Sequence, residues 1–455
     1  MQKAHLRDFT QGNITSQLIT FSLPLFLSNL LQVVYNMVDM VVVGNVLGNT
    51  GVSAVAIGGD VSALLMFVAM GFSNAGQVII ARLIGAKQTD KLGRFVGTMS
   101  GFLFAGAALI SVIALIFQPT LLRWMKTPDE AWDGAMAYSS IMMSGLVFTY
   151  GYNAVSAILR GMGDSKHPFV FISVVAVMNL VLDIIFVAWW DMGPGGAALA
   201  TILSQAVSFL ACVVFLYHSR TAFRLDIRWK DFICWDGAML KDLILLGAPM
   251  AIKTASIQVS KLFVNSWINS YGLAVSAFAG IANKISSVAN LVSAAMNTAG
   301  STVVGQNIAA GKYERVKQVM LAVAKLTLTV AVILSLAFVF FSEPIFGLFT
   351  KAEDEAAVQS IAGEYVPIAV LLFFGAAMRS IMNALINGSG HYKINFATAI
   401  LDGIVMRIGL ALLFGLALDM KHYGFWLGDA LAGFTPFWIG LAFYFSGQWK
   451  NPVKK

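Results

Sequence analysis

The stretch "NLLQVVYNMVD", residues 29–39, decides the fold because it joins an apolar helix to a stripe of polar side chains. The polar residues recur at spacings of three, four and three, and they are Asn29, Gln32, Asn36 and Asp39. Side chains at these spacings lie on one face of an α-helix. A carboxylate on one face of an otherwise apolar helix predicts that this face is turned toward a cavity or a partner rather than toward lipid.

The composition of the whole chain is that of a polytopic membrane protein. Of its 455 residues, 58% are hydrophobic and 12% are charged, whereas about 25% of the residues of a soluble globular protein are charged. Apolar runs such as "FLFAGAALISVIALIF" and "LTLTVAVILSLAFVFF" match the ~20 residues with which an α-helix crosses the hydrocarbon core. The N-terminus has no cleavable signal pattern, so we expect the first span to insert and remain.

We expect twelve membrane-spanning helices. Their approximate bounds are 14–43, 52–81, 92–118, 134–160, 166–190, 196–218, 240–270, 275–308, 317–341, 357–387, 393–417 and 423–447. With the N-terminus in the cytoplasm, twenty Lys and Arg residues fall in the cytoplasmic segments and four in the outer loops, as the positive-inside rule requires. We therefore expect a multi-pass protein of the cytoplasmic (inner) membrane with both termini in the cytoplasm. Because the net charge of +7 follows from this topology, we expect no nucleic-acid partner.

The two halves of the chain repeat each other. Pro24 in "FSLPLFLSNLLQ" matches Pro249 in "LLGAPMAIKTAS", 225 residues later, and "LRGMGDSK" matches "INGSGHYK". Because each half holds an even number of spans, the repeats are parallel and related by an axis along the membrane normal. We expect an N-terminal lobe at 1–218, a cytoplasmic linker at 219–239 and a C-terminal lobe at 240–455. The two pseudo-symmetric six-helix lobes would leave a cleft between them, as in secondary transporters.

The sequence has no pattern typical of an enzyme or of a nucleotide-driven pump. It contains no GxxxxGK[ST] loop, and its loops are too short for an ATPase domain. Cys212 and Cys234 indicate neither a disulfide nor a metal site. We therefore expect transport driven by an ion gradient, with no cofactor beyond the coupling ion. A channel is a competing class, which single-channel conductance would identify.

Polar residues of the first lobe come to a similar predicted depth. Asp39 lies in the outer third of the first span, and Asn179 and Asp183 lie one turn apart in the fifth. Thr201 begins the sixth span at a comparable level. A charged Asp near the bilayer centre costs on the order of 3 kcal/mol, so such residues usually face a cavity or a partner.

Two chemical roles suit these carboxylates. In a poorly solvated pocket two close carboxylates cannot both stay ionised cheaply, so a proton binds. The same oxygens suit a hard cation such as sodium. The alternative is that Asp39 and Asp183 only form hydrogen bonds to neighbouring helices.

These residues resemble the multidrug and toxic compound extrusion (MATE) transporters, closest to the DNA-damage-inducible and archaeal-type branch. The similar stretches are "LPLFLSNLLQVVYNMVDMVVVG", "LRGMGDSKHP", "NLVLDIIFV" and "GGAALAT", and the resemblance covers nearly the whole chain. It implies an all-α integral membrane protein with the twelve-helix MATE fold. It also implies a cation-coupled (H+ or Na+) antiporter that exports amphiphilic organic compounds by alternating access, and we expect a monomer in the lipid bilayer.

The resemblance also implies roles for single residues. Cation coupling falls on Asp39, Asn179, Asp183 and Thr201, which would also ligate Na+ if sodium is the coupling ion; Tyr138 and Asn153 join this network in some members. A proline that bends the first span in some members matches Pro24, for which a static kink is the alternative.

The second lobe departs from a common family pattern, in which spans seven and ten carry acids. A shift of 225 residues places Lys261 opposite Asn36 and Val264 opposite Asp39. Lys261 could pair with Asp402 or contact substrate. The basic residues raise the alternative that the protein exports or flips an anionic or lipid-linked substrate. The residues expected to line the substrate cleft are Asn29, Gln32, Tyr35, Asn36, Gln258, Lys261, Asn265, Arg379, Asp402 and Arg407.

Overall fold

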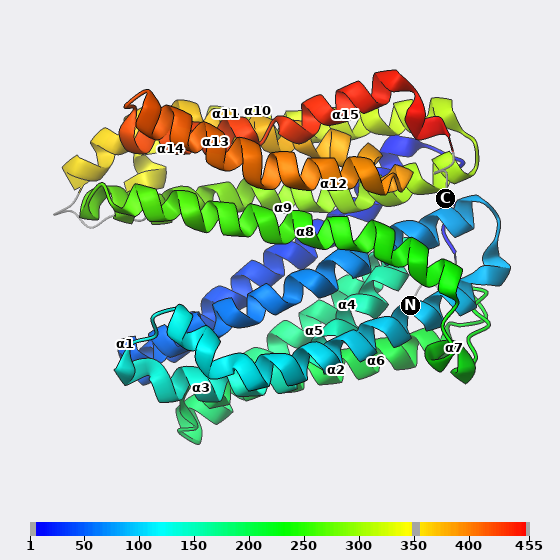
Figure 1. The fold of residues 1–455 in the computed structure, drawn as a ribbon, viewed down its shortest axis with the longest axis horizontal. Helices are drawn as coiled ribbons and strands as arrows, with labels where there is room; N and C mark the ends of the chain where they lie inside the picture. Colours follow the sequence, from blue (N-terminus) through cyan, green and yellow to red (C-terminus); the bar gives the residue numbers. More distant parts are fainter. Residues whose placement is uncertain (1–5, 348–354, 452–455) are drawn as a thin grey trace. The chain divides into compact units, whose positions relative to one another are not determined.

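The computed structural model describes residues 6–347 and 355–451. Every regular element within these residues is a helix (Figure 1), which confirms the all-α prediction. Nine of the described helices are long and apolar enough to cross a membrane, and one bent pair adds a tenth. One of the nine helices is long enough to hold two spans, which adds an eleventh, and a pair of short helices near the C-terminus adds a twelfth. The order of elements is therefore consistent with twelve spans.

The first half of the chain holds six spans. The first two lie in α1 (Ile14–Gly85), whose backbone breaks at Gly48 with φ 64°. Glycine adopts a positive φ at little steric cost, so Gly48 is suited to end one span and start the next. The other four are α2 (Leu92–Trp124), the bent pair α3 (Asp129–Ser144) and α4 (Leu146–Gly161), α5 (Lys166–Asp183) with the π-helical η2 (Ile184–Trp189), and α6 (Gly193–His218). Two short helices, η1 (Thr89–Lys91) and α7 (Trp229–Ile233), lie in the connections.

The second half also holds six spans, and two of them are interrupted. The first four are α8 (Gly237–Asn269), α9 (Leu273–Ala309), α10 (Tyr313–Gly347) and α11 (Glu355–Ser389). The next consists of α12 (Tyr392–Ile400), the π-helical η3 (Leu401–Met406), α13 (Arg407–Leu412) and the π-helical η4 (Leu413–Ala417). The last consists of α14 (Lys421–Ala432) and α15 (Thr435–Ser446), followed by η5 (Gln448–Lys450).

The described chain divides into two compact units. Unit 1 comprises residues 6–8 and 23–251, and unit 2 comprises 9–22, 252–347 and 355–451. The boundaries fall beside Pro24 and Pro249, the prolines that the sequence repeat aligns. The lobe limits expected at 218 and 240 stay a prediction.

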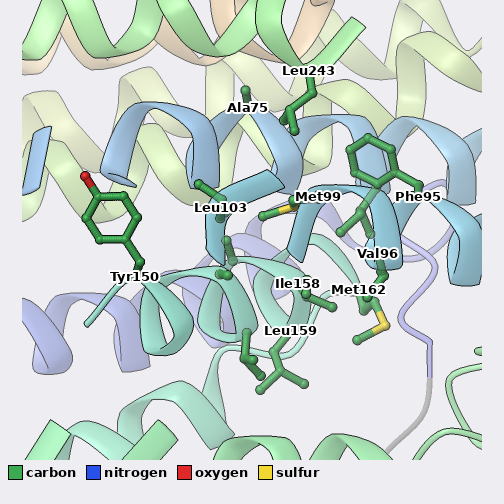
Figure 2. Close-up of a cluster of buried hydrophobic side chains, with 14 of the residues drawn as sticks. Ala75, Phe95, Val96, Met99, Leu103, Tyr150, Ile158, Leu159, Met162 and Leu243 are labelled. Carbon is green, nitrogen blue, oxygen red and sulfur yellow. The ribbon is translucent and has the colours of Figure 1, made fainter. Parts of the chain in front are cut away.

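The core of unit 1 is packed between α2, α4 and the start of α8 (Figure 2). Phe95, Met99 and Leu103, four residues apart on α2, are buried together with Ile158 of α4 and Leu243 of α8. Because lipid tails are as apolar as these side chains, close packing rather than exclusion of water holds such helices together.

The core of unit 2 contains a triangle of aromatic rings. Phe278 of α9, Tyr365 of α11 and Trp426 of α14 lie edge to face, with ring centroids 5.2 to 5.4 Å apart. Such aromatic pairs contribute about 0.5–1.5 kcal/mol beyond the area they bury. The triangle therefore holds three helices at fixed positions beside the polar residues of this unit.

Candidate functional site

Asp39 and Asp183 meet inside unit 1. Their carboxyl groups lie within hydrogen-bonding reach of each other, although 144 residues separate them in the sequence. Asp183 is fully buried. In the part of the chain that the structure describes, no hydrogen-bond donor reaches either oxygen of Asp183 or the Oδ1 atom of Asp39. Two ionised carboxylates within hydrogen-bonding reach of each other repel unless a proton or a cation lies between them.

The end of α5 positions Asp183. It is the last residue of the α-helix, and the π-helical η2 begins at the next position. π-Helical turns are rare and occur frequently at functional sites. One turn earlier the buried Asn179 donates from Nδ2 to Oγ1 of Thr201 at 3.3 Å, and that hydroxyl donates to the carbonyl oxygen of Ala197 at 3.0 Å. This chain of hydrogen bonds fixes α5 against α6 beside the acids.

Two tyrosines lie near the pair of acids. Tyr138 of α3 is buried and close enough to both carboxylates to feel their charge. Tyr35 of α1 lies near Asp39 and within hydrogen-bonding reach of Gln32. Their hydroxyl groups give the acids a polar surrounding inside an apolar helix bundle.

In the described part of the chain, the other residues of unit 1 that were predicted for the coupling network or the cleft form no hydrogen bond with Asp39 or Asp183. Asn153 of α4 donates from Nδ2 to the carbonyl oxygen of Thr149, one turn earlier in its own helix, at 2.8 Å. On α1, Gln32 and Asn36 are exposed and Asn29 is half-buried. These three amides thus continue the polar face that leads to Asp39.

Pro24 lies inside α1, one turn before Ser28. The hydroxyl of Ser28 donates to the carbonyl oxygen of Pro24 at 2.8 Å. The described backbone of α1 is non-helical at Gly48 and not at Pro24. This conformation therefore has a continuous helix at the proposed hinge.

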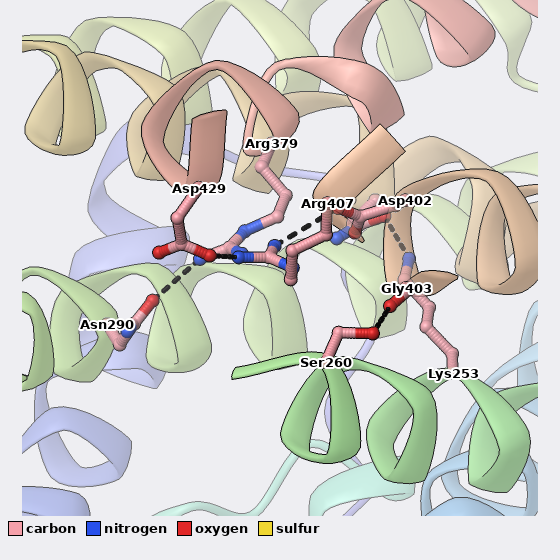
Figure 3. Close-up of polar contacts among 9 residues, drawn as sticks. Lys253, Ser260, Asn290, Arg379, Asp402, Gly403, Arg407 and Asp429 are labelled. Carbon is pink, nitrogen blue, oxygen red and sulfur yellow. Dashed lines mark hydrogen bonds and ion pairs between the residues drawn. The ribbon is translucent and has the colours of Figure 1, made fainter. Parts of the chain in front are cut away.

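Unit 2 holds a buried network of charged side chains (Figure 3). Arg407, the first residue of α13, pairs through Nη2 with Oδ1 of Asp402 at 3.2 Å and through Nη1 with Oδ1 of Asp429. Arg407 and Asp402 are almost completely buried, with 2% and 0% of their side chains exposed. A buried guanidinium between two carboxylates is electrostatically compensated. Of the two alternatives for Lys261, the pairing with Asp402 is not formed here: Arg407 pairs with Asp402, and Lys261 forms no ion pair with a described residue.

Two more cations extend this network. Lys253 of α8 donates from Nζ to Oδ1 of Asn383 at 2.6 Å, and Arg379 of α11 donates from Nη2 to Oδ1 of Asn290 at 2.6 Å. Both therefore bond to amides of neighbouring helices rather than to carboxylates. Within the described residues, neither Lys253 nor Arg379 forms an ion pair.

A close approach of α8 to the π-helical η3 supports the network. Ser260 donates from Oγ to the carbonyl oxygen of Gly403. A Cβ atom at Gly403 would lie 2.6 Å from Cβ of Ser256, closer than real contacts allow. Gly403 is therefore needed where α8 and η3 touch, next to Asp402.

Two small cavities, each of about 20 Å³, lie within unit 2. They share Lys261, Ser286, Leu372 and Asp429 in their linings, so they adjoin. The first cavity is also lined by Asn290, Arg379 and Arg407, and the second by Asn265, Tyr365 and Trp426. Of the predicted cleft residues of this unit, Lys261, Asn265, Arg379 and Arg407 line a cavity. Asp402 lines neither cavity and forms an ion pair with Arg407. Gln258 is exposed on α8 and lines neither cavity.

Three residues of the charged network of unit 2 lie outside the predicted set of cleft residues. Asp429, Asn290 and Lys253 are not among the predicted cleft residues, yet each bonds to or lines the network. For Asp429 and Lys253 a charge inside an apolar span was a usable signal, since such residues usually face a partner. Asn290 carried no comparable signal.

The described residues contain no group of three or more His, Cys, Asp or Glu side chains that could hold a metal ion. A cation in unit 1 would therefore depend on the two carboxylates together with neutral oxygens. Asn179, one turn before Asp183, and Thr201, which accepts a hydrogen bond from Asn179, carry neutral oxygens on α5 and α6.

Comparison with known proteins places both halves of the chain in one group. The MatE family model matches residues 24–185 and again residues 249–413, well over half of the chain. The two matches begin at Pro24 and Pro249, in the register of the internal repeat. Each half thus carries one copy of the same unit.

Individual relatives are distant in sequence but similar over their full length. The chain is 28% identical to the probable multidrug resistance protein YpnP of Bacillus subtilis (strain 168) over 97% of each chain. It superposes with a TM-score of 0.90 and 22% identity on a multidrug resistance MATE family transporter of the MOP superfamily in an outward-facing conformation, covering 100% of both chains. It superposes with a TM-score of 0.89 and 22% identity on a MOP superfamily transporter from Pyrococcus furiosus Vc1, described with a reverse polarity of its binding pocket, covering 99% of this chain and 100% of that one.

Proposed function

The chain belongs to the MatE family of transporters, and from this we propose that it is a cation-coupled exporter of amphiphilic organic molecules. It is a multi-pass membrane transporter of the multidrug-efflux type and not an enzyme. The names of its relatives support small organic substrates.

The contact between Asp39 and Asp183 carries the coupling proposal. A cation that binds between the carboxylates removes their repulsion, so it stabilises the conformation in which they meet. If substrate binds better to the conformation in which they are apart, cation entry and substrate exit are linked. Transport then follows alternating access, and each charge that moves inward contributes about 2.3 kcal/mol per 100 mV of membrane potential.

A proton suits the pair better than sodium does. One proton bridges two carboxyl oxygens directly, which is the arrangement that two acids within hydrogen-bonding reach require. A hard cation needs more oxygen ligands, and the Oγ1 atom of Thr201 is already held between Asn179 and Ala197. We therefore assign H+ as the first coupling ion to test and Na+ as the second.

We further propose a monomer in the cytoplasmic (inner) membrane with both termini in the cytoplasm. The asymmetry of Lys and Arg between the two sets of connecting segments supports this orientation. The N-terminal and C-terminal lobes at 1–218 and 240–455 are proposed as the two moving parts, with the linker 219–239 on the cytoplasmic side.

Proteoliposomes with separately imposed proton and sodium gradients test the coupling. The wild type is compared with Asp39→Asn and with Asp60→Asn, an exposed carboxylate elsewhere on α1 that serves as the control. Ethidium and dansyl-labelled dodecanoate serve as cationic and anionic tracers. We expect an inward-directed proton gradient to drive efflux in the wild type and in Asp60→Asn, and not in Asp39→Asn. Flux that neither gradient drives, or an Asp39→Asn variant equal to the wild type, would refute coupling at this site.

A second candidate is the export or flipping of an anionic or lipid-linked substrate. The observation that favours it is the basic lining of the first cavity of unit 2, with Lys261, Arg379 and Arg407. It shares the coupling site of the first candidate and differs in the molecule carried.

A further inference from the structure

We propose that the two adjoining cavities of unit 2 bind an amphiphile through its oxyanion, a carboxylate or phosphate group held by Lys261 and Arg379. The proposal rests on the proposed transport function and names the class of molecule that the protein carries. The oxyanion lies in the cavity that Arg379 lines, at the point where Lys261 joins it to the second cavity.

Arg407 is not the residue that holds the anion. Asp402 and Asp429 both pair with it, so its charge is already compensated. Lys261 and Arg379 line the same cavity, and neither forms an ion pair with a described residue. Charged groups inside a membrane span usually have a partner, and here the two carboxylates of the network are taken by a third cation.

The orientation of Arg379 fits the binding of an oxyanion. Its Nη2 atom donates to Oδ1 of Asn290 at 2.6 Å, which fixes one edge of the planar guanidinium. A guanidinium carries five N–H donors, so others remain for a ligand in the cavity. Carboxylate and phosphate groups match such a fork with two parallel hydrogen bonds.

Lys261 reaches the cavity from a different helix. It lies on α8 and Arg379 on α11, yet both line the first cavity. Within the described chain the Lys261 ammonium has no hydrogen-bond partner, although it is close enough to Asp429 to interact with its charge. An ammonium is a compact point charge with three donors, so Lys261 would complete the oxyanion site opposite the guanidinium.

The second cavity has a mixed polar and apolar lining. Val264 and Ile268 of α8 and the rings of Tyr365 and Trp426 line it together with the polar side chains of Asn265, Asn283 and Ser286. Because Lys261 belongs to both linings, the cation lies where the two cavities join.

The same lining disfavours an amphiphile with a cationic head. Four cations, Lys253, Lys261, Arg379 and Arg407, lie in this network against the carboxylates of Asp402 and Asp429. A further positive charge would be repelled in a medium where electrostatic interactions are poorly screened. An oxyanion instead brings the network close to neutrality.

Equilibrium binding to the detergent-purified protein tests the site without any gradient. The two probes share a dansyl-labelled twelve-carbon tail and differ in the head, a carboxylate in one and a trimethylammonium in the other. We expect the carboxylate probe to bind at least about tenfold more tightly, as a charge-assisted contact implies. Lys261→Gln and Arg379→Gln should each weaken carboxylate binding by about tenfold and should not weaken trimethylammonium binding, because each removes a charge that repels a cationic head.

Matched variants separate charge from folding. Lys261→Arg and Arg379→Lys keep the charge and should retain most of the preference for the carboxylate probe. Lys325→Gln removes a charge from an exposed site on α10 that lines neither cavity and should bind both probes as the wild type does. Equal binding of the two probes by the wild type, or carboxylate binding that survives both glutamine substitutions, would overturn the proposal.

A third probe identifies the source of the oxyanion. Tighter binding of dansyl-labelled lysophosphatidate than of dansyl-labelled dodecanoate assigns the site to a lipid headgroup, and the reverse order assigns it to a free amphiphile; both orders support an oxyanion site. The result is also independent of the coupling mechanism. Binding without gradient-driven flux refutes the proposed function and keeps the site, whereas gradient-driven flux of ethidium without carboxylate preference refutes the site and keeps the function.

Discussion

Replacing Arg407 with methionine would destabilise unit 2 more than any other single loss of charge in the network. Arg407 is 2% exposed and pairs with Asp402, which is fully buried, and with Asp429. Methionine would leave both carboxylates without their cation. Breaking a buried ion pair by removing one partner costs about 3–5 kcal/mol. At about 2–4 °C per kcal/mol for a unit of 150–250 residues, Arg407→Met should lower the apparent Tm by about 6–20 °C.

The assay is thermal unfolding of the protein in one detergent at one scan rate, and the measured signal is the loss of the monodisperse species. A variant that combines Arg407→Met with Asp402→Asn and Asp429→Asn should regain most of the loss, because no uncompensated carboxylate remains. Lys325→Gln should shift stability by no more than about 0.5 kcal/mol, as surface substitutions usually do. An unchanged Tm for Arg407→Met, or a combined variant as unstable as the single one, would refute the reasoning.

Two further substitutions test how helices are held beside the two sites. Gly403→Ala should lower the free energy of unfolding by about 1–3 kcal/mol, because the added Cβ would lie 2.6 Å from that of Ser256. Adding Ser256→Gly to the same chain should restore the Tm. A Gly403→Ala variant as stable as the wild type would contradict the close approach of α8 and η3. Thr201→Val should lower the free energy of unfolding by about 1–3 kcal/mol, because it leaves the buried amide of Asn179 without its acceptor. Thermal unfolding measures this decrease, and Thr201→Ser, which keeps the hydroxyl, should show little of it.

The common depth of Asp39 and Asp183 in the membrane could be predicted from the sequence. Asp39 belongs to a polar face that helical spacing identifies, and Asp183 lies at a similar level of an outward-running span. Membrane thickness and helix rise convert sequence position into depth, so the sequence predicted that the two acids lie at one level. That they touch depends on how α1 and α5 pack, which is a tertiary property.

The pairing of Arg407 with Asp402 could not be predicted in the same way. On a regular α-helix, neighbours on one face are three or four residues apart, and these two residues are five apart. The intervening η3 is π-helical, and in a π-helix residue i bonds to residue i+5. The π-helical turn therefore brings the side chains together. Because no local pattern in "LDGIVMR" indicates such a turn, the sequence offered Lys261 as one of two open alternatives and did not indicate Arg407 as the partner of Asp402.

The breaks within two of the spans could not be predicted from the sequence for a related reason. The predicted fourth span breaks near Gly145 into α3 and α4, bent by 48°, and the last breaks between α14 and α15. Hydropathy measures apolar content over a whole span and does not respond to a local change of direction. The break before α15 nevertheless lies close to Asp429 in the sequence, so this irregularity, unlike the one near Gly145, belongs to the region of the charged network of unit 2.

The coupling role of the Asp39 and Asp183 pair is tested most directly by measuring proton release when an amphiphile binds to the purified protein. If the proton and the substrate favour different conformations, binding of one must expel the other by the same coupling free energy. In weakly buffered solution, saturating dansyl-labelled dodecanoate or ethidium should release protons from the wild type and from Asp60→Asn, and none from Asp39→Asn. Proton release from Asp39→Asn equal to that of the wild type would contradict a proton shared by the two acids.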